Sequence, residues 1–167
     1  KHSEQIRIFR TLPGMQNADF VRLGSVHRNT FIDSPKCLNA TGEVRSFPGL
    51  FFAGQMIGVE GYVESTASGL VSGLNAVSRL KNFSLAPFPI DTAIGALMNY
   101  VSDAQRTEFQ PMNISYGLMS SYFENNSDDL RFSKKKIGKS ERRLLAATRA
   151  LDKLNNFRNT VIASEAQ

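Results

Sequence analysis

Three closely spaced glycines mark the part of the chain with the clearest chemical potential. Gly54, Gly58 and Gly61 stand between an apolar run that begins at Leu50 and a helical pattern that continues to Leu80. Glycine lets backbone N–H groups approach a ligand closely, and the start of the following helix adds unpaired donors with a partial positive charge. The order strand, glycine turn and helix therefore predicts a site for an anion or an electron-rich carbonyl. The spacing matches neither GxGxxG nor a P-loop, and such turns also occur for purely steric reasons.

The helix expected after the turn has an apolar side and a flank of very small residues. Ser65 is its expected N-cap, which would aim the helix start at the turn. Small residues such as Gly69 and Gly73 suit a helix that passes close to a sheet or a cofactor. The positions with three-and-four spacing, which we expect to be buried, are Ala67, Leu70, Val71, Leu74, Val77 and Leu80.

Few other side chains have the types that catalysis or metal binding needs. Cys37 is the single cysteine, and only His2 and His27 accompany it, so neither a disulfide framework nor a metal site is expected. An inert thiol is the expected state of Cys37. A lone histidine such as His27 is usually a surface or satisfied strand residue.

Positive charge is concentrated near the C-terminus. The chain has a net charge of +5, but the segment 134–158 holds nine basic residues against Glu141 and Asp152. From Ser140 onward an apolar stripe predicts a basic amphipathic helix, which is either a solvated face or an RNA contact. The stripe comprises Leu144, Ala147, Leu151, Leu154 and Val161.

The remaining segments are interpreted as scaffold. Ile6 to Phe9 and Phe20 to Phe31 resemble strands, with a turn at Pro13 and Gly14 between them. Asp91 is the expected N-cap of a helix with one apolar face, and the polar stretch 120–129 is expected to be a loop. That face comprises Ile94, Leu97, Met98 and Val101. No apolar run is long enough to cross a bilayer, so we expect a soluble, cytoplasmic protein with no membrane partner.

Several motifs resemble one known family. The sequences GQMIGVEGYVESTASGL at 54–70, TLPGMQNADFVRLGSVHRNTFIDSPKCL at 11–38, FPIDTAIGALMNYV at 88–101 and FQPMNISYGL at 109–118 resemble the folate- and FAD-dependent tRNA (uracil-5-)-methyltransferases, the TrmFO family. The related MnmG (GidA) flavoproteins have a similar AGQ-glycine loop. They carry GTTGYEEA where this chain has GVEGYVES, and they lack the VHRNTF stretch, which favours the folate branch.

The resemblance implies an enzyme that methylates C5 of a uridine in RNA, with tRNA as the favoured substrate. Methylenetetrahydrofolate would donate the methylene group, FAD would supply the hydride, and NAD(P)H would be the reductant. The family's cysteine chemistry belongs to motifs that Cys37 does not match, so no catalytic residue is expected in this segment. The alternatives are the same chemistry on ribosomal RNA and a non-catalytic RNA-interaction module.

The resemblance also assigns binding residues. His27 would stack on the pterin of the folate, with Arg28 and Asn29 near the folate or the RNA. The expected RNA contacts are Lys134, Lys135, Lys136, Lys139, Arg142 and Arg143. The expected flavin-binding residues are Gly54, Gln55, Gly58, Glu60, Gly61, Tyr62 and Ser65.

The fold class implied is α/β, as the C-terminal portion of a GidA-like, Rossmann-type FAD-binding flavoprotein. A chain of 167 residues without a GxGxxG fingerprint would hold only part of that fold, with the N-terminal part of the same protein as its partner. We expect three segments. Residues 1–46 would form the end of an inserted substrate domain for folate and RNA, with the return strand. Residues 47–83 would form the C-terminal strand, loop and helix of the FAD-binding domain, and 84–167 a helical C-terminal region with the basic amphipathic helix.

Overall fold

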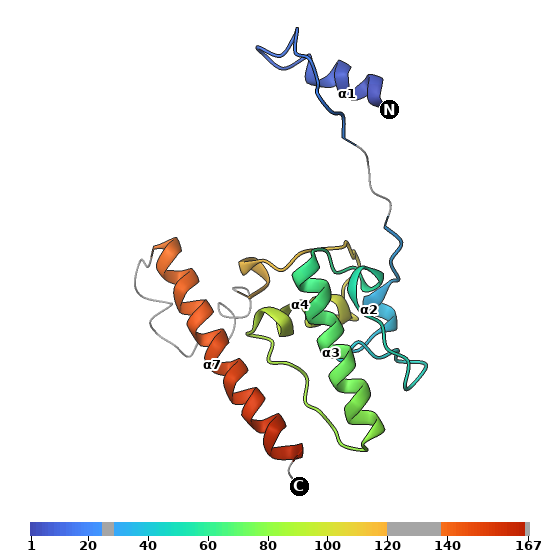
Figure 1. Cartoon of the computed structure of the whole chain (residues 1–167), viewed down its shortest axis with the longest axis vertical. Helices are drawn as coiled ribbons and strands as arrows, with labels where there is room; N and C mark the ends of the chain where they lie inside the picture. The colour runs from blue at the N-terminus through green and yellow to red at the C-terminus, as the bar shows by residue number, and fades with distance from the viewer. Residues whose placement is uncertain (25–28, 120–137, 166–167) are drawn as a thin grey trace.

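The computed structural model describes residues 1–24, 29–119 and 138–165 (Figure 1). Their helices include α1 (His2–Phe9), α2 (Ser34–Cys37), the 3-10 helix η1 (Gly54–Ile57), α3 (Tyr62–Leu80), α4 (Ala93–Ser102) and α7 (Lys139–Glu165), and residues 116–119 are also helical. Within these ranges extended pairing is limited to isolated bridges, Leu38 with Val44, Glu43 with Phe51, and Val59 with Met112. The strand expected before the glycine turn is therefore reduced to single bridge residues, and the described part of the chain is mainly helical.

The strand expected at Ile6 to Phe9 is wrong, because these residues form the end of α1. Two alternating isoleucines are too short a pattern to outweigh local helical pairs, and Glu4 and Arg7 form an ion pair of 2.9 Å one helical turn apart. No residue of α1 is buried, and the helix lies apart from the others in Figure 1. The predicted turn is present at Gly14, whose φ is +84°.

One apolar cluster holds the central helices together. Its buried members are Leu38, Ile57, Val59, Val71, Leu97, Met98, Tyr100 and Val101. Helix α4 supplies the centre of this core, and it contacts both α2 and α3. Because Ile57 and Val59 belong to the glycine turn, the turn is anchored directly in the core.

Helix α3 buries only part of the face expected, since Val71 is buried and Ala67 and Leu74 are half-buried. Its buried residues are Ser68, Val71, Ser72, Asn75 and Ser78, whereas Leu70 and Leu80 are 54% and 83% exposed. The reason is hydrogen bonding: the Ser72 hydroxyl donates to the Phe52 carbonyl over 2.9 Å. Short hydroxyl side chains let the helix approach the preceding loop and satisfy its backbone groups.

The apolar face predicted for α4 is confirmed, but its N-cap is Thr92 rather than Asp91. The Thr92 hydroxyl accepts from the Gly95 N–H over 3.1 Å and donates to the Pro89 carbonyl over 2.6 Å. A Cβ at Gly95 would overlap that same carbonyl. The chain therefore enters α4 through a tight junction centred on Thr92.

The predicted C-terminal helix is confirmed as α7, although its apolar stripe is only partly covered. Leu144 and Leu151 are 68% and 61% exposed, whereas Ala147 and Leu154 are half-buried. Farther along, the Phe157 ring lies 4.6 Å from the Phe88 ring, centroid to centroid. None of the helices within the described residues is long and apolar enough to cross a membrane.

Candidate functional site

The glycine turn combines three glycines of positive φ, Gly54, Gly58 and Gly61, with a short 3-10 helix. Ala53 is extended, η1 follows, and Gly58 ends η1 with φ of +78° and ψ of +22°. Gly61, at φ of +94°, is the N-cap of α3. Residues with side chains rarely adopt these positive φ angles, so the turn depends on glycine. The result is a compact link from the bridge residue Phe51 to the start of α3.

Several N–H groups of the turn are already used inside the chain. Gly54 N–H donates to the Ser68 hydroxyl over 2.8 Å, and Gly58 N–H donates to the Gln55 carbonyl over 3.0 Å. Glu60 N–H donates to the Met112 carbonyl over 3.0 Å. These three donors therefore hold the turn in shape and do not face a ligand.

The N-terminus of α3 supplies the donors that the turn itself lacks. Its N-cap Gly61 makes no side-chain capping bond, so the first-turn N–H groups remain available together with the positive end of the helix dipole. The N-cap predicted at Ser65 is therefore wrong. The Ser65 N–H donates to the Gly61 carbonyl over 3.0 Å, inside the first helical turn.

Packing inside the chain explains the need for glycine at two of the three positions. A Cβ at Gly58 would lie 2.5 Å from Cζ of Phe109. A Cβ at Gly61 would lie 2.7 Å from Nδ2 of Asn113 and would also overlap the Glu64 carboxylate. Phe109 and Asn113 were not assigned to the site from the sequence, because nothing local marks a residue about 50 positions away as a neighbour of the turn.

The segment 29–34 is tied to the same turn. Ile32 N–H donates to the Met56 carbonyl over 2.9 Å, and the buried Ser34 hydroxyl donates to the Ile57 carbonyl over 3.0 Å. The Phe31 ring meets the Phe109 ring edge-on at 5.9 Å. Asn29 is exposed just before this anchor. His27 and Arg28 lie outside the described residues.

The side chains that reach solvent from the turn include those of Gln55, Met56, Glu60 and Tyr62. Tyr62 is 93% exposed and Val63, beside it, is 79% exposed. An exposed phenol next to an uncapped helix start offers a flat apolar surface and backbone donors at one place. This combination can hold a planar ligand that carries carbonyl groups.

Of the predicted RNA-binding residues, Arg142 and Arg143 are described and both are exposed. The Arg143 guanidinium lies 5.3 Å from the centroid of the Tyr116 ring, within the range of a cation–π contact. Lys134, Lys135 and Lys136 lie outside the described residues, and of Lys139 only the backbone, at the start of α7, is described.

The cysteine region shows no catalytic arrangement. Cys37 is exposed and unpaired with another cysteine. Its neighbour Lys36 donates to the Asp33 carboxylate over 2.6 Å, and this hydrogen bond with its charge attraction raises the pKa of Lys36. Within 1–24, 29–119 and 138–165, no cluster of three metal-ligating side chains is found.

Comparisons with known proteins place these features in a family. The family model described as Glucose inhibited division protein A matches residues 1–84. The chain is 50% identical over 157 residues to a methylenetetrahydrofolate–tRNA-(uracil-5-)-methyltransferase TrmFO from Natranaerobius thermophilus, which covers 94% of this chain and 34% of that protein. The corresponding TrmFO of Desulfitobacterium hafniense is 49% identical over 158 residues, covering 95% of this chain and 34% of that protein.

A shorter match has a higher identity. The TrmFO of Streptococcus pyogenes is 55% identical over 119 residues, covering 71% of this chain and 27% of that protein. The chain thus spans about a third of the length of the curated relatives it matches. With half of its residues matched by the family model and nearly all of them aligned to TrmFO proteins, the chain belongs to the Glucose inhibited division protein A family.

Proposed function

We propose that this chain is part of a methyltransferase that uses methylenetetrahydrofolate and FAD to methylate C5 of a uridine in RNA. The observation that carries the proposal is the identity of about 50% to TrmFO proteins across 94% of the chain. The names of those relatives favour tRNA over ribosomal RNA as the substrate. In this proposal FAD supplies the hydride chemistry, NAD(P)H serves as its reductant, and this chain positions the cofactor.

The glycine turn is the proposed flavin contact. Its first-turn donors and helix dipole suit the carbonyl oxygens of a flavin ring, and the exposed Tyr62 offers a flat surface beside them. Gly58 and Gly61 give the turn its shape. The Ser68 hydroxyl accepts from Gly54 N–H and donates to the Ser65 carbonyl, so it holds these two residues in place. Gln55 and Glu60 reach solvent on this side and would contact the ring or orient the loop.

The folate is proposed to lie against the segment that contains His27, Arg28 and Asn29. Support comes from the bonds that tie Ile32 and Ser34 to the carbonyls of the glycine turn. Those bonds bring the end of the VHRNTF motif to the proposed flavin contact. A pterin held near Asn29 would then be close enough to the flavin for transfer between the two cofactors.

The rest of the FAD-binding domain is proposed to cover the apolar side of α3. Val63, Leu70 and Val77 recur every seven residues and are 79%, 54% and 44% exposed. A helix with such a face is normally buried against another element. An α/β sheet supplied by the longer polypeptide, with 47–83 as its last strand, loop and helix, would bury it. The segments 1–46 and 84–167 would then belong to the inserted substrate domain and the helical tail.

The flavin assignment is tested by changing an exposed residue, so that the fold is left intact. In the polypeptide extended to the length of its relatives, Tyr62→Ala should lower the FAD bound per chain. Lys81→Ala, at an exposed position just past the other end of α3, should leave it unchanged. Flavin absorbance of the purified proteins measures the stoichiometry, and equal occupancy in wild type and Tyr62→Ala would remove the turn from the flavin site.

A further inference from the structure

A polar cleft of about 590 Å³ lies toward the C-terminal end of α3. Its walls come from the turn 39–43, the last helical turns of α3 and the residues 82–85 that follow. At 1.5 Å per residue, Asn75 on its wall is roughly 20 Å along the helix from Tyr62. The cleft is therefore separate from the proposed flavin contact.

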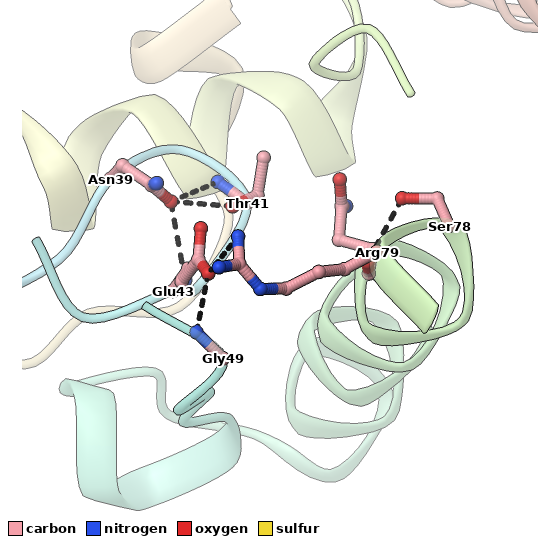
Figure 2. Close-up of polar contacts among 7 residues, drawn as sticks. Asn39, Thr41, Glu43, Gly49, Ser78 and Arg79 are labelled. Atoms are coloured by element: carbon pink, nitrogen blue, oxygen red, sulfur yellow. Dashed lines mark hydrogen bonds and ion pairs between the residues drawn. The ribbon is translucent and has the colours of Figure 1, made fainter. Parts of the chain in front are cut away.

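One wall of the cleft is a turn fixed by a single carboxamide (Figure 2). Oδ1 of Asn39 accepts from Thr41 N–H over 3.0 Å, from the Thr41 hydroxyl over 2.5 Å and from Glu43 N–H over 3.2 Å. This saturates the oxygen and leaves Nδ2 as a donor. The wall is thus a preformed surface with its own hydrogen-bonding capacity.

The charges that line the cleft are already compensated. Arg79 lies 3.1 Å from a Glu43 carboxylate oxygen, and the same oxygen accepts from Gly49 N–H over 2.7 Å, as Figure 2 shows. Because this pair cancels, the cleft offers no strong attraction to a charged ligand. Its chemistry instead suits a neutral ligand rich in donors and acceptors.

A carboxamide and two phenyl rings in the same cleft could select one kind of neutral polar ligand over another. Asn75 is 6% exposed, and its Nδ2 donates to the Val71 carbonyl over 2.8 Å, which leaves its Oδ1 as an acceptor. The half-buried rings of Phe51 and Phe83 line the same cleft. Carboxamides that pair with base edges and phenyl rings that stack on base faces are the groups by which proteins recognise nucleobases.

We propose that this cleft binds the base of a nucleoside, with Phe83 and Phe51 against the base and Asn75 and Asn39 on its edges. The base could come from a free nucleotide or from an unpaired residue of an RNA strand, and both present the same donors, acceptors and π-face. The RNA source rests on the proposed function, whereas the nucleotide source does not.

The test compares Phe83→Ala with Phe47→Ala in the purified chain. Phe47 is 66% exposed and outside the cleft. Titration calorimetry and ligand-observed NMR with adenosine, uridine, adenosine monophosphate and a short single-stranded RNA give the dissociation constants. Phe83→Ala should weaken binding about fivefold or more, because a lost aromatic stack is worth at least that much. Phe47→Ala should bind as wild type does.

Further variants separate the two sources and guard against unfolding. Phe83→Leu keeps the fold while removing the aromatic face, and it should show the same loss. Changing Arg142 and Arg143 to Gln should lower RNA affinity but leave adenosine binding intact. The proposal that the chain binds RNA can therefore be disproved independently of the proposal that the cleft binds a nucleoside. If the chain binds adenosine but Phe83→Ala does not weaken RNA binding, the ligand of the cleft is a free nucleotide. No nucleoside binding at millimolar concentration, or equal losses in Phe83→Ala and Phe47→Ala, overturns the proposal.

Discussion

At the scale of single residues, glycines that look alike in the sequence have different roles. Gly58 has a positive φ and faces Phe109, whereas a Cβ at Gly69, within α3, would enter open space. The sequence predicts a turn at Gly58 from its neighbours. It cannot reveal the packing against Phe109, because that residue lies about 50 positions away in the chain, beside the bridge between Val59 and Met112.

This difference predicts opposite effects of one substitution. Gly58→Ala should lower the free energy of unfolding by about 1–3 kcal/mol, through the left-handed backbone and the overlap with Phe109. Gly69→Ala should raise it by about 0.5–1 kcal/mol, because alanine is the better helix former. Urea denaturation of both variants measures the difference, and a Gly58→Ala protein as stable as wild type would contradict the geometry.

At the scale of elements, periodicity identified α3, α4 and α7 but not always the buried face. Leu70 and Leu80 lie on the apolar side of α3 yet face solvent, because Ser68 and Ser72 bond the backbone of the preceding loop. A pattern of apolar residues marks a face that is suited to burial against another element. It does not show that, among the described residues, the face of α3 with Ser68 and Ser72 is buried while Leu70 and Leu80 face solvent.

The junction into α4 predicts a stability effect at Thr92. Thr92→Ala removes both the cap of Gly95 and the bond to Pro89, so the free energy of unfolding should fall by about 1–2 kcal/mol. Thr92→Ser retains the hydroxyl and should recover most of this loss. Thermal unfolding followed by circular dichroism measures both, and equal loss in the two variants would show that the hydroxyl bonds are not the cause.

Helix α7 predicts an electrostatic effect on RNA binding. Changing Arg142 and Arg143 to Gln should reduce affinity for every RNA sequence and flatten the salt dependence by ~0.7 slope unit for each phosphate that is no longer neutralised. Arg7→Gln on α1 is the control, because that side chain is exposed but paired with Glu4. Filter binding at several salt concentrations supplies the slopes. Unchanged slopes would mark the basic face of α7 as merely solvated.

At the scale of the whole molecule, the family was predictable because its motifs are local. The glycine loop and the VHRNTF stretch each lie within a few consecutive residues, and the comparisons confirm the assignment they suggested. The α/β sheet was expected from the same resemblance, but the described residues pair only as isolated bridges. A strand such as 50–52 needs a neighbouring strand, and among the described residues it has only the bridge of Phe51 with Glu43. The matched relatives are about three times as long as this chain.

The same partial coverage predicts how the chain alone behaves toward FAD. The glycine turn is proposed to form one side of a flavin site, while the GxGxxG motif that would hold the ribose and pyrophosphate does not occur in the sequence. The isolated chain should therefore bind FAD much more weakly than the longer polypeptide. Fluorescence titration of the two proteins measures this, and submicromolar binding by the isolated chain would place the whole FAD site within these residues.

Tyr62, exposed at the start of α3, is also a suitable position for a fluorescent probe. The chain contains four tyrosines and no tryptophan, so Tyr62→Trp would introduce a single indole emitter at the glycine turn. At 93% exposure the larger ring can be accommodated without repacking the interior. Its emission overlaps the absorption of an oxidised flavin, so energy transfer would dim the indole whenever a flavin occupies the turn. Cofactor arrival could then be followed in real time from within the protein itself.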